Sequence, residues 1–344
     1  MRGLLKGVTQ RLLGAAARAV DDAATIAVSR DTLKFRARHS TGERLRAIFD
    51  FADEWAELKD NFDFAQPVAL SPLLTEVRGG QKDLRWNSDY TAFFPQHSAM
   101  WASSSANQTA SARVVTLTPA RPTVVIVHGY LAGQYALEQR IWPIERLNEL
   151  GLNVVLFTLP FHGVRLGKGE RRGFPTKHPR ENIEGLRQAV FDLGNLVRWL
   201  RQAGCSKVGV AGMSLGSYVS SLLATTTAEL DFLVTWVPLA SFADFALEQH
   251  QLGEDLEARA RAHQTLERVY AKVSPLERTP CIAKGKTLVV GARADRITPI
   301  THAQRLARHF QAPLHSVPGG HLLQVGRAEG FSAMEDFLRG ARIL

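Results

Sequence analysis

The sequence predicts an α/β fold built on a doubly wound, mostly parallel β-sheet. Short runs of apolar, often β-branched residues are typical of parallel strands covered on both faces, and they occur at residues 123–127, 153–158, 208–211, 232–237 and 287–291. Segments with helical periodicity alternate with these runs, at residues 134–150, 181–203 and 301–310. This alternation indicates a parallel sheet, and ligands of such sheets bind beyond the carboxyl ends of the strands.

The composition limits the classes of protein to consider. The chain has 344 residues, 45% of them hydrophobic, which is enough for one large α/β domain with additions or for two domains. Its two cysteines, Cys205 and Cys281, cannot form a disulfide framework and fit a reducing compartment, so we expect a cytoplasmic protein. The sequence has no apolar run of membrane-spanning length, no zinc-ligand spacing, no Walker-type glycine loop and no internal repeat. We therefore expect no metal and no organic cofactor.

The chain is strongly basic. Its formal net charge of +9 and its isoelectric point near 9.8 predict some affinity for anionic surfaces, such as phospholipid headgroups or nucleic acid. Because the sequence contains no nucleic-acid recognition module, we expect no nucleic-acid partner. The charge instead leaves peripheral contact with an anionic membrane as a hypothesis.

Residues 1–30 combine apolar and basic positions with helical periodicity, among them Leu4, Leu5, Val8, Leu12, Arg2 and Lys6. Arg11 and Arg18 interrupt the apolar centre that a secretory signal needs. Asp21 and Asp22 disfavour an organellar transit peptide. Two interpretations remain: a helix packed on the main domain, and an interfacial helix that touches membrane.

The next eighty residues carry a weaker pattern. Residues 44–59 indicate a helix with a buried apolar stripe, and residues 98–111, rich in Ser, Ala, Asn and Thr, indicate a loop. We assign residues 1–112 to a helical N-terminal extension. Further along, the sequence predicts strands at 113–118 and 313–317, a polar helical segment at 241–274, and a closing helix at 331–339.

A candidate nucleophile lies between a predicted strand and a predicted helix. The segment Gly212-Met213-Ser214-Leu215-Gly216 has the Gly-x-Ser-x-Gly pattern of a nucleophile elbow. A serine that points out of such a sharp turn is under backbone strain, and its neighbours two residues away crowd the turn, so glycine is favoured at both positions. The following helix directs its first amide groups at whatever the serine attacks.

Residues 113–344 resemble the α/β-hydrolase fold of serine esterases and lipases. The resemblance depends on four matches in the right order: His128-Gly129-Tyr130 after a strand, the elbow around Ser214, Asp295 just past another strand, and Pro318-Gly319-Gly320-His321 past the next. The order Ser, Asp, His is the one this fold uses. Nothing comparable covers residues 1–112. Residues 241–275 fall where this fold often carries a cap.

The resemblance implies a catalytic triad. Ser214 would attack, His321 would take its proton, and Asp295 would hold the imidazole in one tautomer, with Asp244 as the reserve acid. The backbone N–H groups of Leu215 and Tyr130 would form the oxyanion hole, with Leu131 in place of Tyr130 if the loop runs one residue longer.

Other residues at the strand ends are candidates for secondary roles. We expect His128 to brace its loop, and we treat His162 and Met213 as candidates for substrate contact. The loop at residues 165–180 carries six basic residues against Glu170 and indicates either a solvated loop or an anion-attracting lip at the rim of the site; the six are Arg165, Lys168, Arg171, Arg172, Lys177 and Arg180.

The sequence thus predicts a serine hydrolase that cleaves a carboxylic ester, with lipid esters among the candidate substrates, through an acyl-enzyme. Peptidase, thioesterase and acyltransferase activities on the same scaffold are the first alternatives. A non-catalytic binding protein on a hydrolase scaffold is the second, and the complete triad disfavours it. Fold alone does not determine the substrate.

Overall fold

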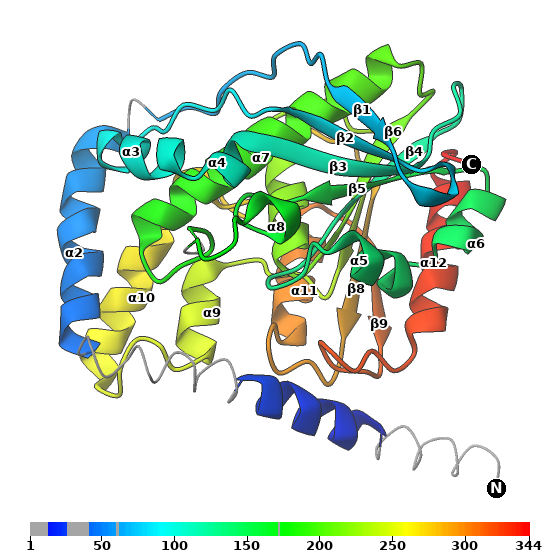
Figure 1. Cartoon of the computed structure of the whole chain (residues 1–344). Coiled ribbons are helices and arrows are strands. Elements are labelled where there is room, and N and C mark those ends of the chain that lie inside the picture. The colour runs from blue at the N-terminus through cyan, green and yellow to red at the C-terminus, as the bar shows by residue number, and fades with distance from the viewer. Residues whose placement is uncertain (1–12, 26–40, 60–61, 171–172) are drawn as a thin grey trace, which may run out of the picture.

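A mixed nine-stranded β-sheet is the centre of the computed structural model, which describes residues 13–25, 41–59, 62–170 and 173–344 (Figure 1). The strand order is β1-β2-β3-β5-β4-β6-β7-β8-β9. The strands are β1 (Leu73–Glu76), β2 (Lys82–Asn87), β3 (Thr109–Thr116), β4 (Thr123–Val127), β5 (Asn153–Thr158), β6 (Val208–Met213), β7 (Phe232–Trp236), β8 (Thr287–Ala292) and β9 (Leu314–Val317).

Neighbouring strands from β4 and β5 through β9 pair in parallel, whereas β1, β2 and β3 form an antiparallel edge that joins β5. Every residue of β4, β5, β7 and β8 is buried, which explains why these strands are visible in the sequence as continuous apolar runs. The predicted doubly wound, mostly parallel sheet is therefore confirmed.

Helices cover both faces of the sheet. They are α2 (Thr41–Leu58), α3 (Pro95–Ser103), α4 (Ser105–Gln108), α5 (Tyr135–Ile141), α6 (Ile144–Glu149), α7 (Pro179–Gln202), α8 (Leu215–Leu223), α9 (Phe242–Glu248), α10 (Leu256–Tyr270), α11 (Ile300–His309) and α12 (Arg327–Gly340). Alternate residues of one strand enter two separate cores, because successive strand side chains point to opposite faces. Val125 packs with residues of α7, α8 and α11, and Val124 packs with residues of α5, α6 and α12.

The region before residue 113 differs from the helical extension that the sequence predicted. Strands β1 and β2 and the start of β3 lie within it and belong to the sheet. All four residues of β1 are exposed, and only Asp83, Leu84 and Trp86 of β2 are buried. Neither strand therefore has the continuous apolar run of a fully buried strand. Helix α2 lies where a helix was predicted. Ile48 and Trp55 of the expected stripe are buried, and Phe51, which was not expected in the stripe, is buried with them.

The predicted loop at residues 98–111 is wrong. This segment forms the second half of α3, all of α4 and the start of β3. It is held by buried hydrogen bonds: the Gln188 side-chain oxygen accepts from Trp101 Nε1 and from Asn107 Nδ2, both at 2.9 Å. A segment rich in Ser, Asn and Thr is typical of a loop. Here the contacts with Gln188, which composition does not reveal, stabilise helices and a strand instead.

Two helical predictions are refined. The single helix expected at 134–150 is divided into α5 and α6 by Pro143, which has no backbone N–H to continue the helix. The polar segment at 241–274 is helical as predicted and forms α9 and α10. Helix α10 contacts α2, where the Arg261 guanidinium lies 5.6 Å from the centre of the Phe49 ring. That α9 and α10 cover the site as a cap stays a prediction.

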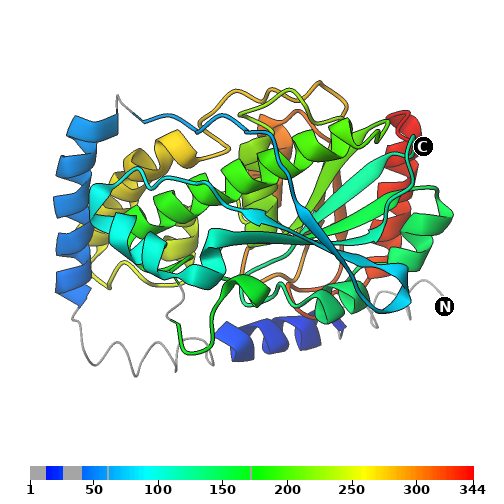
Figure 2. The same cartoon turned by 45° about the horizontal axis from the view of Figure 1, so that its top comes forward.

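The parallel strands all end at one edge of the sheet, and this edge carries the candidate site. A helix at residues 13–25 lies along the edge at which β8 and β9 end (Figures 1 and 2). Within the described part of the chain, none of the helices combines the length and the apolar character needed to cross a bilayer. Leu4, Leu5, Val8 and Leu12 lie outside the described residues.

Candidate active site

Ser214 occupies a strained turn between β6 and α8. Its backbone has φ 53° and ψ −116°, a conformation that costs a non-glycine residue about 1–3 kcal/mol. The turn is held by hydrogen bonds to the neighbouring strand: Ser214 N donates to Trp236 O at 3.0 Å, and Leu239 N donates to Ser214 O at 3.2 Å. The surrounding structure therefore imposes the turn, as expected for a nucleophile elbow.

The two glycines of the elbow are required by crowding. A Cβ atom on Gly212 would lie 2.3 Å from the carbonyl oxygen of Gly216, and one on Gly216 would lie 2.1 Å from the carbonyl oxygen of Val127, at the end of β4. Movement of the first oxygen would distort the start of α8, and movement of the second would distort the end of β4. The start of α8 is thereby packed directly against the carboxyl end of β4.

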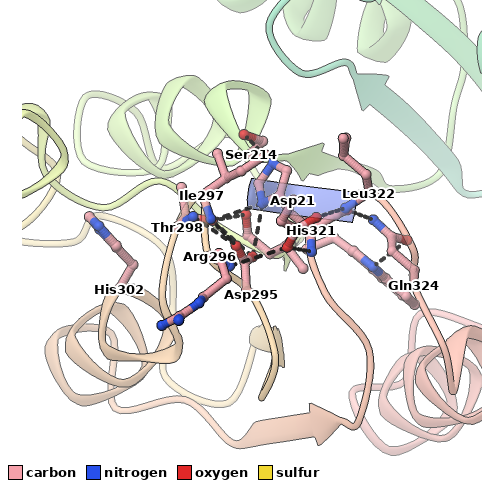
Figure 3. Close-up of polar contacts among 12 residues, drawn as sticks. Asp21, Ser214, Asp295, Arg296, Ile297, Thr298, His302, His321, Leu322 and Gln324 are labelled. Atoms are coloured by element: carbon pink, nitrogen blue, oxygen red, sulfur yellow. Dashed lines mark hydrogen bonds and ion pairs between the residues drawn. The ribbon is translucent and has the colours of Figure 1, made fainter. Parts of the chain in front are cut away.

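His321 connects Ser214 to Asp295 (Figure 3). Its Nε2 lies 3.0 Å from Ser214 Oγ, and its Nδ1 lies 2.8 Å from Asp295 Oδ2. The three residues follow β6, β8 and β9, whose carboxyl ends lie at one edge of the sheet, with β7 between β6 and β8. The structure thus brings together the serine, acid and histidine that the sequence identified. Such a line can move a proton from the serine hydroxyl to the imidazole.

The Asp295 carboxylate is buried and held in one orientation. Its Oδ1 accepts the backbone N–H groups of Ile297 at 2.9 Å and Thr298 at 2.8 Å, which leaves Oδ2 toward His321. The Thr298 hydroxyl lies 3.1 Å from Asp295 Oδ2 and 3.0 Å from His321 Nδ1. Thr298 was not predicted from the sequence; the Asp-x-x-Thr spacing, typical of an aspartate that bonds nearby backbone N–H groups, was the available signal.

The surroundings of His321 favour its protonated form. Burial on its own lowers the pKa of His321, but the charge of Asp295, its hydrogen bond and the charge of Asp21 together outweigh burial, so the pKa lies above its ordinary value of 6.5. A base with a raised pKa accepts a proton more readily, which suits a group that must activate a hydroxyl.

Asp244, the reserve acid, is paired elsewhere. Its carboxylate contacts His263 Nε2 at 2.9 Å and the guanidinium of Arg305. Among the described residues, Asp244, His263 and Glu267 form a group whose donor atoms could hold a metal ion. The Arg305 cation already lies against one oxygen of this group, and a second cation there would be repelled. We assign neither a triad role nor a metal site to Asp244.

The candidate oxyanion donors lie on both sides of Ser214. Leu215 is the first residue of α8, and the first N–H groups of a helix have no partner within it. The loop after β4 is close to the elbow, because a Cβ on Gly129 would lie 3.4 Å from Ser214 Cβ. Tyr130 follows Gly129 in this loop, and Leu131 has a φ of 62°. That the N–H of Tyr130 meets an oxyanion stays a prediction.

The histidines after β4 and β5 lie side by side. His128 Nδ1 donates to Gly129 O at 2.7 Å, and its Nε2 accepts from Leu159 N at 3.0 Å, so it braces its loop as expected. His162 is fully buried, its Nδ1 donates to Pro160 O at 2.8 Å, and its ring centre lies 6.1 Å from that of Tyr130. A substrate contact of His162 stays a prediction.

Met213 precedes Ser214 at the end of β6 and is half-buried. Its sulfur lies 3.8 Å from Gln324 Nε2, in the loop that carries His321. Met213 is therefore next to the site, and its contact with a substrate stays a prediction.

Two interpretations of the loop at residues 165–180 were left open, a solvated loop and an anion-attracting lip, and Arg165 and Arg180 fit neither. Arg165 is completely buried and pairs with Asp192, also completely buried, at 2.8 Å. Arg180 pairs with Glu54 of α2. Arg171 and Arg172 lie outside the described residues. Two of the six basic side chains thus stabilise the fold and do not add positive charge to the rim of the site.

Comparison with known proteins supports the same interpretation. A family model described as the alpha/beta hydrolase family matches residues 124–334. The uncharacterized protein Rv2627c of Mycobacterium tuberculosis is 33% identical over 282 residues, which cover 78% of this chain and 67% of that protein.

Solved structures share the fold. The acetyl xylan esterase from Paenibacillus sp. R4 has a TM-score of 0.54 at 15% identity, over 84% of this chain and 93% of that chain. Acetyl xylan esterase 1 from Thermoanaerobacterium sp. JW/SL YS485 has a TM-score of 0.54 at 16% identity, over 85% and 93% of the two chains. With the family model matching more than half of the sequence, we conclude that the chain belongs to the alpha/beta hydrolase family.

Proposed function

We propose that the protein is a serine hydrolase that cleaves carboxylic esters through an acyl-enzyme. The observation that carries this proposal is the line of hydrogen bonds from Ser214 Oγ through His321 to Asp295, at 3.0 Å and 2.8 Å. Membership of the alpha/beta hydrolase family supports a hydrolytic reaction.

The first half of the reaction forms the acyl-enzyme. Ser214 Oγ attacks the ester carbonyl carbon while its proton passes to His321 Nε2, and the carbonyl oxygen becomes an oxyanion that accepts from Leu215 N–H and from the loop at Tyr130. The intermediate collapses, the bond to the alcohol oxygen breaks, and His321 returns the proton to the leaving alcohol.

The second half releases the acid. Water gives a proton to His321 as it attacks the acyl carbon, and His321 then protonates Ser214 Oγ as the acyl–oxygen bond breaks. Throughout, Asp295 keeps the Nδ1 proton of His321 in place and stabilises the imidazolium, and Thr298 lies beside the bond between them.

Apolar side chains beside the site favour a substrate with an apolar acyl group. Leu131 follows the candidate oxyanion residue and is 53% exposed, and Leu322 follows His321 and is 54% exposed. Tyr130 and Leu323, in the same two loops, and Val164, in the segment after β5, are also exposed. Exposed apolar groups at a binding site are stabilised when an apolar ligand covers them, so they support esters of lipids or other apolar acids.

Other acyl transfers share the first step. A peptidase, a thioesterase or an acyltransferase would form the same acyl-enzyme and differ in the leaving group or in the acceptor. A non-catalytic binding protein is the alternative of another class; the intact line from Ser214 to Asp295 counts against it.

The test begins with a fluorophosphonate probe on the full-length chain. We expect labelling, and we expect Ser214→Ala to remove it, together with the hydrolysis of p-nitrophenyl esters of rising chain length. Ser206→Ala is the matched control, because Ser206 is exposed near the opposite end of β6. Circular dichroism checks that each variant is folded. Labelling that survives in Ser214→Ala would contradict the assignment, and a folded wild-type chain that does not label would favour the binding protein.

A further inference from the structure

The helix at residues 13–25 lies against the loops that carry the acid and the histidine (Figures 1 and 3). Its buried residues are Gly14, Ala17 and Asp21, which recur with helical spacing on one face. The small side chains at 14 and 17 allow a close approach, since a Cβ on Gly14 would lie 3.7 Å from Pro318 O, in the His321 loop. Among the buried residues of the described helix, Asp21 is the one with a charged side chain.

Asp21 is fully buried and accepts three backbone hydrogen bonds from the site. Its Oδ2 accepts from His321 N at 2.7 Å and from Arg296 N at 3.2 Å, and its Oδ1 accepts from Leu322 N at 3.0 Å. These N–H groups belong to His321 itself, to the residue after it, and to the residue after Asp295. One carboxylate therefore joins the loop after β9 to the loop after β8.

Gly320 gives independent evidence that the helix is fitted to the His321 loop. A Cβ on Gly320 would lie 2.7 Å from Asp21 Oδ2 and 3.2 Å from Ala17 Cβ. The glycine before His321 is therefore explained by the space that the helix occupies. A helix that merely rested on the surface would not require this.

The geometry points to Asp21 as a positioning residue for the proposed esterase reaction. Its carboxylate holds the backbone of His321 and of the Asp295 loop at a fixed separation, so that the imidazole reaches Ser214 and Asp295 at once. This inference rests on the proposed function, and it makes the helix at residues 13–25 part of the machinery that aligns the triad.

The charge of Asp21 provides a separate readout. The described charged groups that act on the imidazole are Asp295, from the loop after β8, and Asp21, from the helix, and both raise the pKa of His321 against the effect of burial. The exposed guanidinium of Arg296 pairs with Asp22 at 3.8 Å. Removal of the Asp21 charge should therefore lower the pKa of His321.

The test compares Asp21→Asn with Asp22→Asn in the full-length chain. Asparagine preserves the shape of Asp21 but has one acceptor oxygen in place of two, so part of the three-bond contact is lost and an amide donor faces a backbone N–H. Asp22 is the matched control: it is the adjacent carboxylate, it is exposed, and its contact is an ion pair at the surface.

We expect Asp21→Asn to lower kcat for a p-nitrophenyl ester, and the rate of fluorophosphonate labelling, by about 10- to 100-fold, the range typical when a supporting contact is lost or a reacting group is displaced by about 1 Å. KM should change little. The pKa of His321, measured from its imidazole signals by NMR with His321→Gln to assign them, should fall. Asp22→Asn should preserve the wild-type rate and pKa.

A purely structural role would give a different result. If Asp21→Asn only unfolded part of the sample, active-site titration would show fewer active molecules, each with the wild-type kcat and pKa, and the inference would be overturned. A wild-type rate in folded Asp21→Asn would overturn it equally. A wild-type chain that does not label contradicts the proposed function itself, and the NMR titration still shows whether Asp21 acts on His321.

Discussion

Nδ1 of His321 lies 2.8 Å from Oδ2 of Asp295, and the other oxygen of that carboxylate accepts two backbone N–H groups. We expect Asp295→Asn to lower kcat by about 10⁴-fold, because the amide would favour the wrong imidazole tautomer and could not stabilise the imidazolium. KM should stay nearly unchanged. Steady-state kinetics on a p-nitrophenyl ester measures both.

Asp244→Asn is the matched control for that variant. Asp244 also follows a strand, but it pairs with His263 and Arg305, so its loss should affect kcat far less. If Asp244→Asn is the more damaging change, the assignment of the acid is wrong.

The raised pKa of His321 sets the pH dependence of the reaction. Only the neutral imidazole can accept the proton of Ser214, so kcat/KM should rise with pH through a midpoint above the ordinary value of 6.5. In Asp295→Asn the midpoint should move to lower pH, because the main group that raises the pKa is lost. A wild-type midpoint below 6.5 would contradict the proposed surroundings of His321.

The same shift affects folding in the opposite direction. Below pH 6.5 the protonated His321 contributes to the free energy of unfolding, and this contribution disappears as the pH rises through the raised pKa of the folded state. Urea titrations of wild type and His321→Gln at several pH values measure it. We expect the difference between the two proteins to shrink with rising pH.

Gly216→Ala should destabilise the elbow. The new Cβ would lie 2.1 Å from Val127 O, a backbone oxygen of the sheet, so we expect a loss of at least about 1–3 kcal/mol and loss of probe labelling. Gly340→Ala is the control, since its Cβ meets open space at the end of α12 and alanine is the better helix former by about 1 kcal/mol. Thermal denaturation compares the two, and equal melting temperatures would contradict the predicted clash.

Arg165→Met should leave the buried Asp192 carboxylate without its cation. Both side chains are 0% exposed, and burial raises the pKa of Asp192 while Arg165 opposes that rise. Removing one member of a buried pair costs about 3–5 kcal/mol. The control is Arg146→Met, which breaks surface pairs with Glu335 and Glu149 and should destabilise the protein far less.

A double variant, Arg165→Met with Asp192→Asn, separates the charge from the packing. If an unpaired charge causes the loss, the second change should restore part of the stability. No recovery in urea titrations would indicate that the hydrogen bonds of Arg165 to Thr158 O and Asn107 O matter more.

Membrane contact can be tested without disturbing the described helix. Deletion of residues 1–12 removes Arg2, Lys6 and Arg11, and each basic group near an anionic surface contributes about 1 kcal/mol. We propose that the full-length chain co-sediments with vesicles containing anionic lipid, and that salt and this deletion both weaken the binding. Equal recovery in the supernatant with anionic and neutral vesicles would contradict the proposal.

The positions of Ser214, Asp295 and His321 were predictable from the sequence. Ser214 and Asp295 each follow a buried strand that is visible as an apolar run, and His321 follows the partly exposed strand β9. Parallel strands bring their carboxyl ends to one edge of a sheet. These local rules, together with the resemblance to the α/β-hydrolase fold, grouped residues that are 107 and 26 positions apart.

Only the tertiary structure revealed the contact of Asp21 with the His321 loop, the burial of Arg165, and the edge strands β1 and β2. An aspartate in a basic amphipathic segment carries no signal that it will meet His321 N, 300 positions away. An arginine is expected at the surface, and Arg165 is buried because Asp192 supplies its charge partner across the fold. The exposed residues of β1 follow no apolar pattern, because backbone pairing with β2 defines that strand. These features depend on contacts that exist only in the folded chain.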